Sequence, residues 1–179
     1  MQKIMNVFQR DGDRVIDAIN PGAEWVAAGE GVATRKFDGS CCLIQGGKLY
    51  RRYDSKNGKT PPEGFIPAQD PDPNTGHWPG WLLIGDGPQD RWHREAFALE
   101  EFEDGTYELC GPKLQGNPEK LPYNQLIPHG LEKYAFFPRT YEGIKEWFEK
   151  YPFIEGVVFH HEDGMFAKIR LRDFGIKRL

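Results

Sequence analysis

A lysine followed by an acidic residue and a glycine is the first feature that could do covalent chemistry. Lys36 precedes Phe37, Asp38 and Gly39, at the end of an alternating apolar run. A lysine amine is a nucleophile only without its proton, and its ordinary pKa is about 10.4. A reactive Lys36 therefore needs burial or nearby positive charge, for which Arg35 is adjacent, while Gly39 permits a tight turn and the close approach of a ligand. The same residues also fit a surface turn with a solvated lysine.

Two glutamates lie beside apolar runs and need partners if the fold buries them. Glu108 falls within the run 107–110, where its carboxylate could accept hydrogen bonds from hydroxyl groups. Glu155 opens the run 156–159, and a carboxylate at the mouth of a strand suits Mg²⁺ bound partly through water. A solvent-facing side chain is the alternative for each, because strand residues alternate between two faces.

Two cations close the series of chemically suggestive residues. Lys168 and Arg170 are separated by one residue, so on a strand they project from the same face. That geometry could hold a phosphate from two donors, and it could add positive charge near Lys36 if the strands are neighbours. A solvated strand face is the ordinary alternative.

Strands must position most of these residues, because short alternating apolar runs dominate the sequence. We expect strands at 32–36, 41–45, 48–53, 106–110, 156–161 and 165–170. Gly46-Gly47 and Asp163-Gly164 predict hairpins between neighbouring runs. A capping Thr140 and a helical spacing of apolar residues predict a helix at 140–151, and 92–99 is a second candidate. The long segment 56–80 is rich in proline and glycine and predicts a loop, so the fold class is α+β.

Composition sets the broad class. The 179 residues fit a single domain, 1–179, and the net charge of −4 argues against a pure nucleic-acid-binding module but not against an enzyme. Three cysteines, at 41, 42 and 110, contain no Cys-x-x-Cys spacing, which disfavours a disulfide framework or a zinc site. The sequence has no signal-peptide pattern and no membrane-length apolar run, so we expect a cytoplasmic monomer without a membrane partner.

Histidines and aromatic residues are expected to have ordinary structural roles. His93, His129, His160 and His161 show no metal-ligand spacing, and Trp78 and Trp81 are expected to pin the long loop rather than stack on bases. Tyr134, Phe136 and Phe137 could stack on a base, but we expect all three to belong to the core.

In their order along the chain, the four features resemble the covalent nucleotidyltransferases, which are polynucleotide ligases and mRNA capping enzymes. The segments 49–54, 72–81 and 108–112 are similar to those of small single-domain 5′-to-3′ RNA ligases. The resemblance implies a nucleotidyltransferase (ATP-grasp-like) adenylation domain of antiparallel sheets with few helices. It also leads us to expect no OB-fold domain, because few residues follow the last motif.

The resemblance implies a role for each residue. Lys36 would attack the α-phosphate of ATP and form lysyl-AMP, AMP would pass to a 5′-phosphate RNA end, and a 3′-hydroxyl would seal the join. The implied nucleotide-binding residues are Thr34, Arg35, Lys36, Arg51, Glu108, Glu155, Lys168 and Arg170. Glu108 would bind the ribose, Glu155 would hold Mg²⁺ or alternatively Mn²⁺, and Arg52 would contact substrate. Ser40 and Cys41 depart from the pattern, because many ligases carry an arginine soon after the glycine.

Other functions stay open at this point. Within the same superfamily, a minimal DNA ligase or a capping-type enzyme that uses GTP would share the motifs. A non-catalytic RNA- or protein-binding module is the alternative from another class, and a protein AMP-transferase with Lys36 as a relay is a third. The presence of Lys36, Glu108, Glu155 and Lys168 together disfavours the non-catalytic module. The resemblance implies an ATP-dependent RNA ligase, with RNA repair as its expected role.

Overall fold

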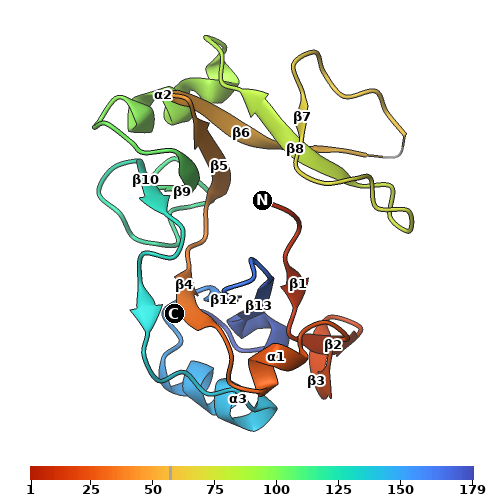
Figure 1. The fold of residues 1–179 in the computed structure, drawn as a ribbon. Coiled ribbons are helices and arrows are strands. Elements are labelled where there is room, and N and C mark those ends of the chain that lie inside the picture. Colours follow the sequence, from red (N-terminus) through yellow and green to blue (C-terminus); the bar gives the residue numbers. More distant parts are fainter. Residues whose placement is uncertain (57) are drawn as a thin grey trace. The chain divides into compact units, whose positions relative to one another are not determined.

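The computed structural model describes residues 1–56 and 58–179 as a sheet-rich α+β protein, which confirms the predicted class (Figure 1). Its residues form two compact units. The first unit consists of residues 1–3 and 38–129, and the second consists of residues 4–37 and 130–179. The chain thus passes from one unit to the other directly after Phe37, inside the lysine motif. The single domain expected over 1–179 stays a prediction.

The second unit is built on a five-stranded sheet. Its strand order is β1 (Met5–Asn6), β13 (Phe166–Arg170), β12 (Gly156–His160), β4 (Val32–Lys36) and β11 (Lys133–Tyr134). The central strand β12 is antiparallel to both of its neighbours. Its side chains alternate, so Val157 and Phe159 enter a core with Ile144 and Phe148 of helix α3 (Tyr141–Lys150). Helix α1 (Glu24–Ala27) and the ribbon of β2 (Phe8–Asp11) and β3 (Arg14–Ile19) complete this unit.

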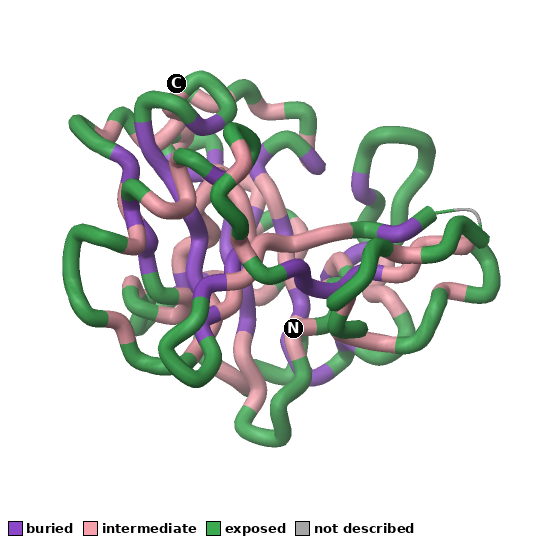
Figure 2. The backbone as a smooth tube through the Cα atoms, turned by 90° about the horizontal axis from the view of Figure 1, so that it is seen from above, coloured by how far each residue is buried: buried purple, intermediate pink, exposed green. Residues whose placement is uncertain are grey.

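The first unit is built on a six-stranded antiparallel sheet. Its strand order is β10 (Gln125–Pro128), β9 (Gly105–Cys110), β5 (Ser40–Gln45), β6 (Lys48–Ser55), β8 (Trp78–Leu83) and β7 (Ile66–Pro67). The 3₁₀ turn η1 (Pro88–Asp90) leads into helix α2 (Arg91–Phe97). Cys42, Ile44, Leu49 and Leu109 form the centre of a separate core, to which α2 contributes Ala96. In Figure 2 the buried positions lie mainly along the strands, and the loops are mostly exposed.

Most expected elements are confirmed with small shifts at their ends. Thr140 caps α3 by accepting a hydrogen bond from the Gly143 N–H at 3.2 Å. Gly46 and Gly47 both have positive φ, as the predicted two-residue hairpin between β5 and β6 requires. No helix among the described residues is long and apolar enough to cross a membrane.

The loop predicted over 56–80 is wrong in part, and its residue 57 lies outside the described residues. Trp78–Leu83 is a strand that pairs with β6, although Pro79 and Gly80 read as turn residues. Gly80 is needed for close packing, since a Cβ there would lie 2.4 Å from the Ile66 carbonyl oxygen and from the Phe65 ring. Gln69 accepts a hydrogen bond from the Trp78 indole at its carbonyl, and Trp81 is buried, so both tryptophans hold the segment as expected.

Candidate functional site

Lys36 ends strand β4, and its side chain contacts Glu155, which directly precedes β12. The Lys36 Nζ lies 2.5 Å from Glu155 Oε2, and both side chains are largely covered. The backbone register sets this contact, because Lys36 pairs with Gly156 and Gly156 pairs on its other side with Arg170. Gly156 has no room for a side chain, since a Cβ would lie 2.3 Å from the Ile169 carbonyl oxygen. The lysine, the carboxylate and Arg170 thus meet around a position that must be glycine.

Lys168 belongs to the same face of this sheet as Lys36. It pairs with Val158, which in turn pairs with Thr34, two residues before Lys36 on β4. Residues two apart on a strand share a face, so these rows are neighbours. Burial, together with the positive charges of Arg170 and Lys36, lowers the pKa of Lys168 to about 8, against the opposing effects of Glu155 and Asp173. One face of the sheet therefore brings together Lys36, Lys168 and Arg170, and Glu155 forms an ion pair with Lys36 there.

Arg170 is anchored by Asp173, which is almost fully buried. Arg170 donates to Asp173 from its backbone N–H and its guanidinium, at 2.9–3.2 Å. Asp173 also accepts from Asn6 at 3.0 Å and forms an ion pair with Arg10. Burial alone would raise the pKa of Asp173, but the bonds and charges of Arg170 and Arg10 outweigh burial and lower it. The N-terminal strands, which the sequence patterns did not predict, therefore help to fix a residue of the predicted site.

Two further predicted residues of β4 point to other partners. Arg35 alternates to the face opposite Lys36, where it pairs with Glu132 at 3.1 Å and lies over the Phe37 ring at 4.6 Å. Thr34 is buried, and its hydroxyl contacts the Val158 carbonyl at 3.2 Å and the His160 Nε2 at 2.8 Å. The structure thus does not direct Arg35 toward Lys36, and the nucleotide roles of Thr34 and Arg35 stay predictions.

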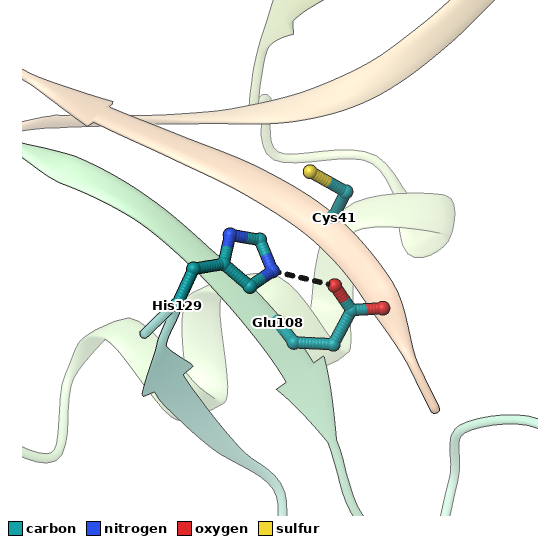
Figure 3. Close-up of side chains that lie close together, drawn as sticks. All are labelled: Cys41, Glu108 and His129. Carbon is teal, nitrogen blue, oxygen red and sulfur yellow. Dashed lines mark hydrogen bonds and ion pairs between the residues drawn. The ribbon is translucent and has the colours of Figure 1, made fainter. Parts of the chain in front are cut away.

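Glu108 lies on β9 in the first unit and is 8% exposed, so the solvent-facing alternative is wrong. One carboxylate oxygen accepts from the Gly39 N–H at 3.1 Å, and the other lies 2.9 Å from Nε2 of His129. The other ring nitrogen of His129 lies 3.0 Å from the Thr106 hydroxyl oxygen. Figure 3 shows Glu108 and His129 facing each other beside Cys41, which pairs with Glu108 across β5 and β9.

Gly39 is required for packing rather than for the turn that its sequence context suggests. It is not among the residues with positive φ. A Cβ at Gly39 would lie 2.2 Å from the Leu109 carbonyl oxygen and 2.7 Å from the Cys110 sulfur. The glycine therefore lets the start of β5 approach β9 closely, which brings its N–H to Glu108.

The two predicted arginines of β6 have structural partners within the first unit. Arg51 forms an ion pair with the buried Asp90, with 3.0 Å between the Arg51 Nε and the Asp90 Oδ1. Arg52 donates to the Met1 carbonyl at 2.6 Å and stacks on the Trp81 ring at 4.8 Å. Burial lowers the pKa of Arg52, and charges at Cys41 and Asp54 oppose that effect.

Sequence patterns missed His129 as a partner of Glu108. It follows β10, and only the antiparallel register of β10 on β9 brings it to Glu108, so no local spacing could have revealed it. Of the aromatic residues considered for base stacking, Tyr134 and Phe137 pack in the core of the second unit as expected. Phe136 does not, since it is 98% exposed.

The fold and the site define a sheet-rich α+β protein in which a strand-end lysine is paired with a carboxylate among cations. Comparison with known proteins identifies the class more closely. A model of the RNA ligase 1 family matches residues 89–178, half of the chain, including Glu108, Glu155, Lys168 and Arg170. The chain therefore belongs to the RNA ligase 1 family.

Individual relatives extend this match over most of the chain. RNA ligase 1 of Mus musculus is 27% identical in an alignment that covers 81% of this chain and 67% of the mouse protein. RNA ligase 1 of Rattus norvegicus is also 27% identical, and that of Pongo abelii is 26% identical, with the same shares covered.

Proposed function

We propose that this protein is an ATP-dependent RNA ligase that carries AMP on Lys36, with a nucleotidyltransferase adenylation fold. The observation that carries the proposal is the Lys36–Glu155 contact of 2.5 Å, set among the cations Lys168 and Arg170. A nucleophilic lysine needs a group that takes its proton, and phosphate binding needs positive charge that is already in place. Membership of the RNA ligase 1 family supports RNA as the substrate class.

In the first step the Lys36 amine attacks the α-phosphorus of ATP. A nitrogen–phosphorus bond forms, the bond to pyrophosphate breaks, and the ammonium proton passes to the Glu155 carboxylate. Lys168 and Arg170 stabilise the negative charge that develops on the phosphate oxygens. Lys168, with a pKa of about 8, is mostly protonated at neutral pH and so can perform this role.

The next two steps transfer AMP to the 5′-phosphate end of the RNA and then seal the RNA. A 5′-phosphate oxygen of RNA attacks the α-phosphorus, the nitrogen–phosphorus bond breaks, and Lys36 regains a proton. A 3′-hydroxyl then attacks the activated 5′-phosphate, forming the phosphodiester and releasing AMP. The protein mainly positions these groups and stabilises charge, as is general for phosphoryl transfer.

A magnesium ion fits the residues present, because Glu155 offers the oxygen ligand that Mg²⁺ prefers and Mg²⁺ usually keeps waters and substrate phosphates as further ligands. When bound, Mg²⁺ neutralises the triphosphate and helps pyrophosphate to leave. Mn²⁺ has a similar preference for oxygen ligands and is an alternative. From the resemblance we propose that Glu108 binds the ribose. On the same basis we propose that Thr34, Arg35 and Arg51 bind the nucleotide and that Arg52 contacts the RNA substrate.

The proposal is tested by sealing of a nicked or single-stranded RNA with a 5′-phosphate and a 3′-hydroxyl. Wild-type protein with ATP and magnesium should seal the RNA, and Lys36→Ala should not. Lys36→Ala should still seal RNA that already carries a 5′-adenylate, because only the first two steps need the amine. Sealing by Lys36→Ala with plain 5′-phosphate RNA would overturn the proposal. Preference for GTP, or for DNA ends, would favour the capping-type or DNA ligase alternatives.

A further inference from the structure

Three side chains of different ligand chemistry converge in the first unit. Cys41 lies on β5, Glu108 lies opposite it on β9, and His129 follows β10. The thiol sulfur, a carboxylate oxygen and an imidazole nitrogen all lie within 4.8 Å of one another. Figure 3 shows the three side chains gathered beside the same two strands. We infer that Cys41, Glu108 and His129 form a binding site for a thiophilic divalent cation, with Zn²⁺ as the expected ion.

The donor set selects zinc over magnesium. Zinc binds sulfur, nitrogen and oxygen together, with bonds of about 2.0–2.3 Å, whereas Mg²⁺ prefers oxygen ligands throughout. A tetrahedral centre with those bonds places its ligand atoms roughly 3.3–3.8 Å apart. The three ligand atoms lie within 4.8 Å of one another, so side-chain movements of about 1 Å would bring them to these separations. A thiolate and a carboxylate would also balance the charge of the ion.

The second layer of contacts already orients the histidine. His129 Nδ1 lies 3.0 Å from the Thr106 hydroxyl, and the His129 backbone N–H donates to the Thr106 carbonyl at 3.1 Å. A hydroxyl can donate or accept, so Thr106 can accept from Nδ1–H once a metal takes the lone pair of Nε2. Thr106 thus acts as a positioning residue that favours the metal-binding tautomer.

Cys41, rather than the adjacent Cys42, supplies the sulfur ligand. Cys42 alternates to the core face of β5, where its side chain is fully buried. Cys41 is only partly covered, and it forms no disulfide. The Arg52 guanidinium lies close enough to Cys41 to interact with it electrostatically. The backbones of Cys41 and Glu108 are held in strands β5 and β9, and His129 directly follows β10. Binding a metal ion therefore requires little further ordering of the backbone, which lowers its entropic cost.

Zinc at this site would occupy Glu108. The consequence rests on the proposed function: if Glu108 binds the ribose, bound zinc excludes the nucleotide, and zinc inhibits adenylation.

The test is a cobalt titration of the reduced, metal-free full-length protein, followed by displacement with zinc. One equivalent of Co²⁺ should give a thiolate-to-cobalt charge-transfer band that zinc abolishes. Cys41→Ser should lose the band, and His129→Gln should weaken zinc binding at least about 10-fold. Thr106→Val should weaken binding by about 10-fold while the band remains, because it changes only the orientation of His129.

Two variants control for chemistry elsewhere in the same unit. Cys42→Ala removes the adjacent thiol, and His77→Gln breaks another histidine–carboxylate pair, the 2.7 Å contact with Asp54. Both should keep wild-type stoichiometry and affinity. Absence of one-to-one binding in the wild type, or equal zinc affinity in wild type and a folded Cys41→Ser, would overturn the site.

Adenylation is measured separately with and without zinc. Inhibition of the wild type by one equivalent of zinc, and loss of that inhibition in Cys41→Ser, supports the competition. A wild type that is never adenylated but still gives the cobalt band contradicts the proposed function and leaves the metal site intact.

Discussion

Lys36 and Glu155 meet at 2.5 Å beside Gly156, the residue of β12 that pairs with Lys36 on one side and with Arg170 on the other. The pair joins a potential nucleophile at the end of β4 to a base directly before β12. Such a pair is expected in a site that must first hold a lysine as a cation and then take its proton.

Glu155→Gln should keep the shape of the pair and remove its charge. We expect the rate of self-adenylation to fall by about 10²–10⁴-fold, the usual range for loss of a general base. The magnesium concentration for half-maximal rate should rise as well, because a ligand is lost. A quench time course at several magnesium concentrations measures both. An unchanged rate and magnesium dependence would show that Glu155 has neither role.

Gly156→Ala should destabilise the second unit. The new Cβ would lie 2.3 Å from the Ile169 carbonyl oxygen and 2.9 Å from the Arg170 Cα, which the backbone can relieve only by moving strands apart. Overpacking of this kind costs about 2 kcal/mol. Gly85→Ala is the matched control, since its nearest neighbour would be 3.8 Å away. Denaturant unfolding that gives equal stability for both variants would contradict the packing argument.

Lys168 should make stability depend on pH in the alkaline range. Its folded-state pKa of about 8 lies below the ordinary lysine value of 10.5, so between these values the unfolded chain holds more protons. Stability therefore rises with pH across that window. Lys168→Met should be more stable than wild type at pH 7, with an advantage that shrinks as the pH rises from about 8 to 10.5.

The exposed Lys177, changed to Met, is the control for this experiment, and it should show no such trend. Unfolding by denaturant at several pH values between 7 and 10.5 measures both variants. A stability difference for Lys168→Met that does not change with pH would contradict the low pKa.

The sequence predicted the strands of the site better than the partners within it. Alternation and glycine turns located β4, β12 and β13, because local patterns determine where a strand runs. The pairing of Glu108 with His129 depends on the register between β9 and β10, which no local pattern contains. Arg35 was expected near the Lys36 amine because the two residues are adjacent in sequence. Strand alternation instead places the Arg35 side chain on the face opposite Lys36, as the structure shows. Strand β8 escaped prediction because Pro79 and Gly80 have turn preferences that tertiary packing overrides.

The most direct test of the account is the intact mass of the protein after incubation with ATP and magnesium. Protein freed of any adenylate by pyrophosphate treatment should gain the mass of one AMP, and Lys36→Ala should gain none while unfolding at a similar denaturant concentration. Lys177→Ala, which removes an exposed lysine, should gain one AMP like the wild type. A gain of AMP by folded Lys36→Ala, or no gain by wild type with ATP, would contradict the central claim that Lys36 carries the adenylate.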